Sequence, residues 1–245
     1  MKPQQIDRTV FIGDVHIPYE DNRAVRVALG FIEYLKPSQV FLTGDIVDFY
    51  QMSKFDKDPS RTLKLQEDLD KTFEFLQRLR VAAGDAKITY CEGNHESRCV
   101  RYLWRHPEIA NLRSLRPEEL LRLKELDITW APSNKTLTHH GFVVTHGSVV
   151  RKWSGYSARA EMEKYGASGI SGHTHREGVC IHTNFSGEYA WYEGGCLCRL
   201  DPEYVIGTPN WQQCVNVGEF IKDDRRFQIR QYNIVKGKLL CDGLL

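Results

Sequence analysis

Short apolar runs that end in glycine and a polar residue alternate with amphipathic segments in the first hundred residues. TVFIGD (9–14), QVFLTGD (39–45) and KITYCEGNHE (87–96) each read as a buried strand that runs into a polar loop. Between them, apolar residues recur at helical spacing over 25–32 and 65–76. Strands that alternate with helices in this way predict parallel βαβ units.

The rest of the chain has a different pattern. GFVVTHG (141–147) is another strand-like run that ends in His-Gly, and Gly166 ends a short amphipathic helix. Alternating apolar positions dominate from about residue 179 onward, so we expect a β-rich C-terminal part. The alternation changes phase between Ile229 and Tyr232, which predicts a β-bulge there.

We expect one domain over residues 1–245, because the chain has no linker, internal repeat or low-complexity segment. A mostly helical, arginine-rich insertion is predicted at about 97–127. The hydrophobic content of 41% and charged content of 27% are ordinary for a globular protein, and a net charge of +1 gives no global attraction to nucleic acid or membrane.

The chain shows neither a transmembrane run nor a signal peptide, so a cytoplasmic location is expected. The seven cysteines lack CxxC spacing and predict buried, reduced thiols. Cys196 and Cys198 alternate along a predicted strand, which is typical of two core cysteines.

Polar side chains that can bind metal follow five of the predicted strands. The carboxyl ends of parallel strands meet at one edge of a sheet, so we expect these side chains to converge there. Their oxygen and nitrogen donors suit manganese, iron or zinc better than calcium. The set is too large for one ion and suits two ions about 3.5–4 Å apart. It comprises Asp14, His16, Asp45, Asp48, Asn94, His95, His146, His173 and His175.

Each of these residues also has a simpler interpretation. A single loop histidine is usually solvated or a core residue, and an aspartate after a strand is often a helix cap. The recurrence of such groups in five successive strand-end loops argues against that interpretation. Glu96 is left with two alternatives, a partner that supports the site or a solvated side chain.

The ordered motifs resemble those of the calcineurin-like metallophosphoesterases. They are DVH (14–16), GDIVD (44–48), GNHE (93–96), HG (146–147) and GHTH (172–175), and they span about two thirds of the chain. The GHTHREG and NWQQ segments look like those of small phage- and prophage-encoded members, for which the location is the host cytoplasm. The resemblance implies an α/β fold of two packed mixed β-sheets flanked by helices, a four-layer α/β/β/α sandwich.

The resemblance also implies the roles of individual residues. One divalent ion is assigned to Asp14, His16, Asp45 and His175, and Asp45 bridges to a second ion that also takes Asn94, His146 and His173. Manganese is the expected metal, with iron, zinc or nickel as alternatives. A water that bridges the two ions attacks the phosphate in line, His95 protonates the leaving oxygen, and Asp48 orients His95.

The chain departs from the family pattern in two places. Ile17-Pro18 follows the first motif where many relatives have glycine, and this removes no ligand. GDIVDFYQ replaces the GDxxDRG of the serine/threonine phosphatases, so Phe49 and Tyr50 are expected to give the site an aromatic surface. That difference argues against a phosphoprotein phosphatase.

The expected substrate is therefore a phosphate ester, with nucleic-acid or nucleotide phosphodiesters favoured. A phosphomonoesterase or phosphoprotein phosphatase is the alternative, and a non-catalytic metal-binding scaffold is a third. The segment 98–124 carries seven Lys or Arg against three acids. It is either a basic wall for a polyanionic substrate or a solvated helix surface. Expected substrate contacts are Arg98, Arg176 and Tyr50. We expect no membrane contact and no obligate protein partner.

Overall fold

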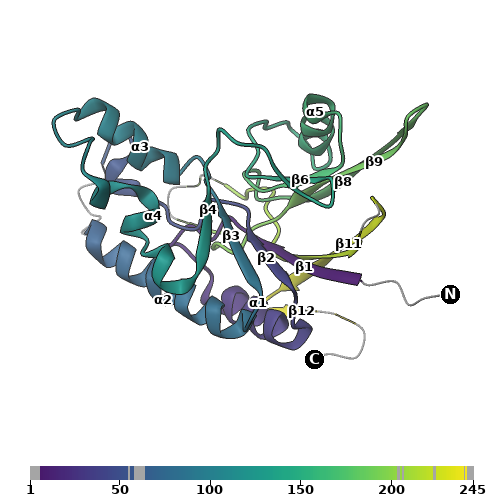
Figure 1. The fold of residues 1–245 in the computed structure, drawn as a ribbon, viewed down its shortest axis with the longest axis horizontal. Coiled ribbons are helices and arrows are strands. Elements are labelled where there is room, and N and C mark those ends of the chain that lie inside the picture. Colours follow the sequence, from purple (N-terminus) through teal and green to yellow (C-terminus); the bar gives the residue numbers. More distant parts are fainter. Residues whose placement is uncertain are drawn as a thin grey trace.

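A seven-stranded mixed sheet forms one half of the strand framework in the computed structural model, which describes residues 6–54, 56–57, 64–202, 205, 207–222, 225–239 and 241. In spatial order its strands are β12 (Lys238–Leu239), β11 (Phe227–Val235), β10 (Cys214–Ile221), β1 (Ile6–Ile12), β2 (Gln39–Leu42), β3 (Lys87–Cys91) and β4 (Ile128–Ala131) (Figure 1). Strands β1 to β4 pair in parallel, as the βαβ pattern predicts, and β10 to β12 are antiparallel.

A five-stranded mixed sheet forms the other half. Its strands, in spatial order, are β5 (Leu137–His139), β6 (Phe142–Thr145), β7 (Gly169–Ser171), β9 (Gly187–Gly194) and β8 (Glu177–Asn184). Strands β6, β7 and β9 are parallel, and the hairpin of β8 and β9 extends beyond the sheet edge (Figure 1). The predicted β-rich part of the chain thus contributes to both sheets.

The described part of the chain contains five α-helices. They are α1 (Asn22–Leu35), α2 (Leu65–Ala83), α3 (Glu96–Arg105), α4 (Pro117–Leu120) and α5 (Tyr156–Tyr165), with 3₁₀ turns η1 (Tyr50–Met52), η2 (Arg113–Leu115) and η3 (Leu123–Leu126). Helices α1 and α2 cover the larger sheet, and α5 covers the smaller one (Figure 1). The segment between β3 and β4 consists of α3, α4 and the turns η2 and η3.

Three apolar layers hold the elements together. Val10 and Leu76 belong to the layer between the larger sheet and its helices. Phe11 and Phe142 meet between the two sheets, with ring centroids 6.1 Å apart. A smaller cluster around Trp191 packs α5 onto the second sheet. The α/β/β/α order of layers implied by the family resemblance is therefore confirmed.

The residues at both ends of the first helix explain where it begins and ends. The Asp21 side chain accepts hydrogen bonds from the backbone N–H of Arg23 and Ala24, which satisfies two of the four free donors at a helix N-terminus. The helix ends at Leu35, two residues before Pro37, whose ring cannot continue a helix.

The predicted β-bulge in the last long strand is wrong. Strand β11 pairs with β10 in one unbroken register from Cys214↔Asn233 to Phe220↔Phe227. The change of phase has another cause, because the strand is covered on opposite faces at its two ends. Ile229 packs into the layer between the sheets, whereas Tyr232 packs against Phe31 of α1.

Candidate metal centre

The loops after strands β1, β2, β3, β6 and β7 meet at one rim of the two packed sheets. Each of these strands delivers at least one predicted ligand to this rim. The ligand side chains are buried or nearly so, which is unusual for aspartate and histidine and requires that their polar atoms be paired.

One group of donors brings together Asp14, His16 and His175. The Nε2 atoms of the two histidines lie 2.9 Å apart. Asp14 Oδ1 lies 3.2 Å from Nε2 of His175 and 3.8 Å from Nε2 of His16. Asp45 Oδ2 lies 3.7 Å from Nε2 of His16. These four residues are the set that the resemblance assigns to the first ion.

A second group lies on the other side of Asp45. Nε2 of His146 is 3.2 Å from Asp45 Oδ2, 2.9 Å from Asn94 Oδ1 and 3.2 Å from Nδ1 of His173. The Asp45 carboxylate thus lies between the two groups, at the position that a bridging ligand requires. These four residues are the set assigned to the second ion.

The tautomers of the histidines direct acceptor atoms toward the centre. Nδ1 of His146 lies 2.9 Å from the carbonyl oxygen of Thr43, and Nδ1 of His16 lies 3.4 Å from Asp48 Oδ2. Both partners only accept, so each Nδ1 carries a proton, and each Nε2 presents a lone pair once the ring is neutral. Lone pairs that converge with carboxylate oxygens repel one another, and a cation between them removes that repulsion. The donor set therefore fits divalent cations.

The same carboxylates also attract protons. Burial lowers the pKa of His146, but Asp45 beside it outweighs burial and raises the pKa to about 9. For His175 the opposing groups are Cys198 and Asp14, which also raise the pKa to about 9. Burial raises the pKa of Asp45, but His146 and His95 outweigh it, so that pKa is well below its usual range. Metal binding must displace these imidazole protons.

The backbone at the centre is held in an unfavourable conformation. Five predicted ligands have φ between 48° and 71°, the left-handed region that costs a residue other than glycine about 1–3 kcal/mol. They are Asp14, His16, Asp45, His173 and His175. Gly172 permits a close approach, because a Cβ atom there would lie 2.3 Å from Asp14 Oδ2. Such strain persists only where surrounding contacts fix the loop.

His95 lies beside the centre with its imidazole 15% exposed. Its Nδ1 is 3.1 Å from Asp48 Oδ2, and its Nε2 is 3.7 Å from Asp45 Oδ2. Arg98 donates to Asp48 Oδ1 over 3.0 Å, and its Nη2 is 3.0 Å from Nε2 of His95. Asp48 thereby joins His95, Arg98 and His16 through one carboxylate.

The structure decides between the two alternatives for Glu96. Its side chain is fully buried and accepts from the backbone N–H groups of Asp45, Ile46 and Gly93 at 2.9 Å, and from the hydroxyl of Tyr90 at 2.7 Å. Glu96 is therefore a partner that ties the β2 and β3 loops together. Burial and the charge of Asp45 raise its pKa.

The contacts of Cys196, Cys198 and Trp211 at the centre were not predicted from the sequence. Cys196 and Cys198 are buried as predicted, but Sγ of Cys198 also lies 3.7 Å from Nδ1 of His175. The Trp211 ring packs on the same imidazole at a centroid distance of 4.4 Å. Hydrogen bonding from Cys196 lowers the pKa of Cys198 well below its usual value. No spacing rule connects residues so far apart in sequence, so only their contacts identify them.

The predicted substrate contacts lie in different surroundings. Arg98 adjoins His95, whereas the Arg176 guanidinium donates to the backbone carbonyl of Arg151. The Tyr50 ring is covered by the ammonium of Lys57, 5.0 Å from its centroid. Phe49 is fully buried in the core, so the expectation that it adds aromatic surface is wrong.

Comparisons with known proteins place these features in context. A family model described as calcineurin-like phosphoesterase matches residues 7–177. Gene 54 protein of Mycobacterium phage D29 is 31% identical, over 96% of this chain and 97% of its own length. Gene 54 protein of Mycobacterium phage L5 is 28% identical, again over 96% of this chain and 97% of its own length.

A solved structure shares the fold at low sequence identity. Vacuolar protein sorting 29 from Cryptosporidium parvum superposes with a TM-score of 0.51 at 14% identity, over 96% of this chain and 95% of its own. At that identity the likeness concerns the fold alone. Among the described residues, the helices are too short or too polar to cross a membrane.

Proposed function

This chain belongs to the calcineurin-like phosphoesterase family, and from that premise we propose that it hydrolyses phosphodiesters of nucleic acids or nucleotides with two divalent metal ions. The family supports a metal-dependent phosphoesterase, and the finer assignment to diesters is our proposal. The observation that carries the two-ion part of the proposal is the position of Asp45 between two groups of converging acceptor atoms.

We assign Asp14, His16, Asp45 and His175 to one ion, and Asp45, Asn94, His146 and His173 to the other. Manganese suits this mixture of nitrogen and oxygen donors, and iron, zinc and nickel suit it as well. Two divalent ions held there would neutralise the anionic oxygens of the phosphate and lower the pKa of a bound water. The buried surroundings keep these ligands in place before the substrate arrives.

His95 is the proposed general acid. Its Nδ1–H faces Asp48, so the ring orientation is fixed and Nε2 is the atom available to the leaving oxygen. A protonated Nε2 cannot accept from Arg98, because both groups are then donors. We infer that Nη2 of Arg98 turns to a phosphate oxygen when His95 carries its proton, while Nη1 stays on Asp48.

The test is hydrolysis of bis-p-nitrophenyl phosphate and p-nitrophenyl phosphate, each with manganese, nickel, iron and zinc. A diesterase gives the larger kcat/KM with the diester, and Asp45→Ala abolishes turnover of both esters. Faster hydrolysis of the monoester would favour a phosphomonoesterase instead. Binding of two ions without turnover of any ester would leave only the scaffold alternative.

A further inference from the structure

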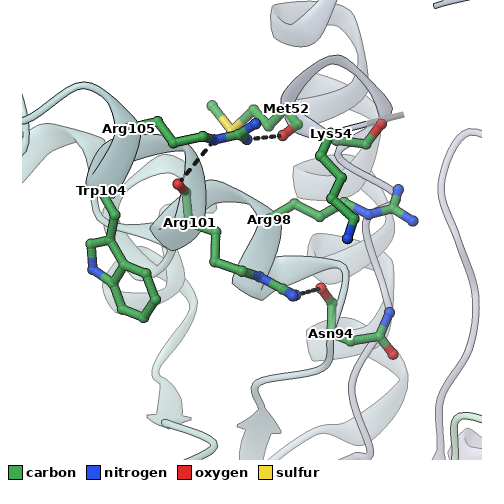
Figure 2. Close-up of a pocket in the computed structure, with 8 residues that line it drawn as sticks. Met52, Lys54, Asn94, Arg98, Arg101, Trp104 and Arg105 are labelled. Atoms are coloured by element: carbon green, nitrogen blue, oxygen red, sulfur yellow. Dashed lines mark hydrogen bonds between the residues drawn. The ribbon is translucent and has the colours of Figure 1, made fainter. Parts of the chain in front are cut away.

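A cavity of about 510 Å³ opens next to the metal centre, and its lining carries several positive charges. We name it the basic groove and define it by its lining residues, which come from the end of η1, the segment after it and α3 (Figure 2): Met52, Lys54, Arg98, Arg101, Trp104 and Arg105. Its volume lies within the range of about 300–1,000 Å³ that is common for ligand sites.

The basic groove is continuous with the site already described. Asn94, the proposed ligand of the second ion, lines its inner end. Nη2 of Arg101 donates to the backbone carbonyl of Asn94 over 2.8 Å (Figure 2). Arg98 lies between the groove and His95. A substrate with its phosphate at the metal centre would therefore extend directly into the groove.

The charges of the groove are available to an anion. Arg101 and Arg105 hydrogen-bond to the backbone carbonyls of Asn94, Ser97, Arg101 and Met52. In the part of the chain that the structure describes, neither guanidinium pairs with a carboxylate, and no acidic residue lines the groove. Burial lowers the pKa of nearby Lys57, and the charges of Arg98 and Arg105 add to this decrease.

An exposed indole distinguishes this groove from a simple anion site. Trp104 is 73% exposed near the end of α3 and lines the groove together with the arginines. A flat aromatic face next to cationic side chains is the combination that binds bases and phosphates of an unpaired strand. In a duplex the bases stack on one another, so their faces are closed to a protein side chain.

We propose that the basic groove binds a single-stranded segment of nucleic acid beside the scissile phosphate, with an unpaired base stacked on Trp104 and the flanking phosphates on Arg101 and Arg105. The proposal rests on the proposed function and specifies its substrate as a polynucleotide rather than a mononucleotide. Arg98 is not counted in this subsite, because it is engaged by Asp48.

The test is fluorescence anisotropy of labelled oligothymidylate with the full chain, with EDTA present to stop turnover. Trp104→Ala should raise Kd about tenfold without changing the salt dependence, and Trp104→Phe should retain part of the affinity. Arg105→Gln should reduce the slope of log K against log salt by about 0.7, the value for one phosphate contact to a single strand. Matched controls are Tyr34→Ala and Arg26→Gln on α1, whose side chains are exposed on the far helical layer.

Three results would overturn the proposal. They are an unchanged Kd and salt slope in the Trp104 and Arg105 variants, equal affinity for a blunt duplex, and displacement of the oligonucleotide by polyglutamate as effectively as by unlabelled oligothymidylate. Binding and catalysis can also fail separately. If oligonucleotide binding depends on Trp104 but no diester is cleaved, the proposed function is rejected and the groove proposal is retained. If bis-p-nitrophenyl phosphate is cleaved but oligonucleotide binding is unchanged in the Trp104 and Arg105 variants, only the groove proposal is rejected.

Discussion

The carboxylate of Asp48 lies 3.1 Å from Nδ1 of His95, close enough to accept a hydrogen bond from it and to fix the orientation of the ring. Burial raises the pKa of Asp48, but the hydrogen bonds from His16 and His95 outweigh it and hold the pKa far below its usual range. We therefore expect Asp48 to stay ionised, and we propose that it orients His95 rather than exchanges protons.

Replacement of His95 should affect substrates according to their leaving groups. A sugar hydroxyl is a poor leaving group that needs a proton, whereas p-nitrophenolate is a stable anion. We expect His95→Ala to lower kcat for an oligonucleotide about 10²- to 10⁴-fold and to lower it far less for bis-p-nitrophenyl phosphate. Asp48→Asn should give a smaller loss of about 10–100-fold. Equal losses on both substrates would show that His95 is not the acid.

The two ions should be separable by mutation. Asn94 contacts only the second group of donors, so Asn94→Ala should leave one tightly bound ion per chain. Asp45 lies between the groups, so Asp45→Ala should weaken both ions. Metal content after gel filtration, with calorimetric titration of manganese, provides the measurement. Two ions retained at wild-type affinity in Asn94→Ala would contradict the assignment.

Glu96 should stabilise the fold as well as the site. In Glu96→Gln an amide nitrogen replaces an oxygen that accepts backbone N–H groups, so buried donors lose their partner. The expected decrease in the free energy of unfolding is about 2–3 kcal/mol. Tyr90→Phe removes one donor only and should cost about 1 kcal/mol. Urea unfolding measures both, and equal stability of Glu96→Gln and wild type would reject the role.

Gly172 should not tolerate a side chain. The methyl group of Gly172→Ala would overlap Asp14 Oδ2 and push this carboxylate away from His175, so manganese affinity should decrease at least about tenfold. Gly30→Ala is the matched control, because a Cβ atom there meets no atom within 4 Å. On the exposed face of α1 it should raise stability by about 1 kcal/mol. Wild-type metal affinity in Gly172→Ala would show that the loop relaxes.

The stability of the protein in EDTA should decrease as the pH rises from 6.5 to 9. His146 and His175 have pKa values of about 9 in the folded chain, and that of His16 is also raised, whereas all three lose their protons near 6.5 when unfolded. Their stabilising contribution is complete below pH 6.5 and is lost as the pH passes through 9. The pKa of Cys198 is lowered in the folded chain, so its contribution to stability increases with pH and opposes this trend. Cys198 involves one proton, whereas the histidines involve three.

Manganese should remove this pH dependence, because bound metal replaces the imidazole protons. Thermal unfolding at several pH values, with EDTA and with manganese, measures the difference. A melting temperature in EDTA that stays level or rises across this range would contradict the assigned imidazole charges.

Local sequence patterns determined the framework and the position of the centre. Apolar runs and helical spacing reflect the burial of each element, so β1 to β3 and α1 were predictable. Parallel strands share a carboxyl edge, which predicted that Asp14, Asp45 and Asn94 lie together. The roles of individual residues came from the order of the motifs rather than from their chemistry.

Only the tertiary structure decided which layer each side chain faces. Ile229 and Tyr232 face different layers in a regular strand, and Phe49 is buried beside a polar loop. Cys198 contacts His175 across 23 positions of sequence, and Glu96 accepts the backbone N–H of Asp45 across 51. These contacts depend on how distant segments pack against each other, and local periodicity carries no information about that packing.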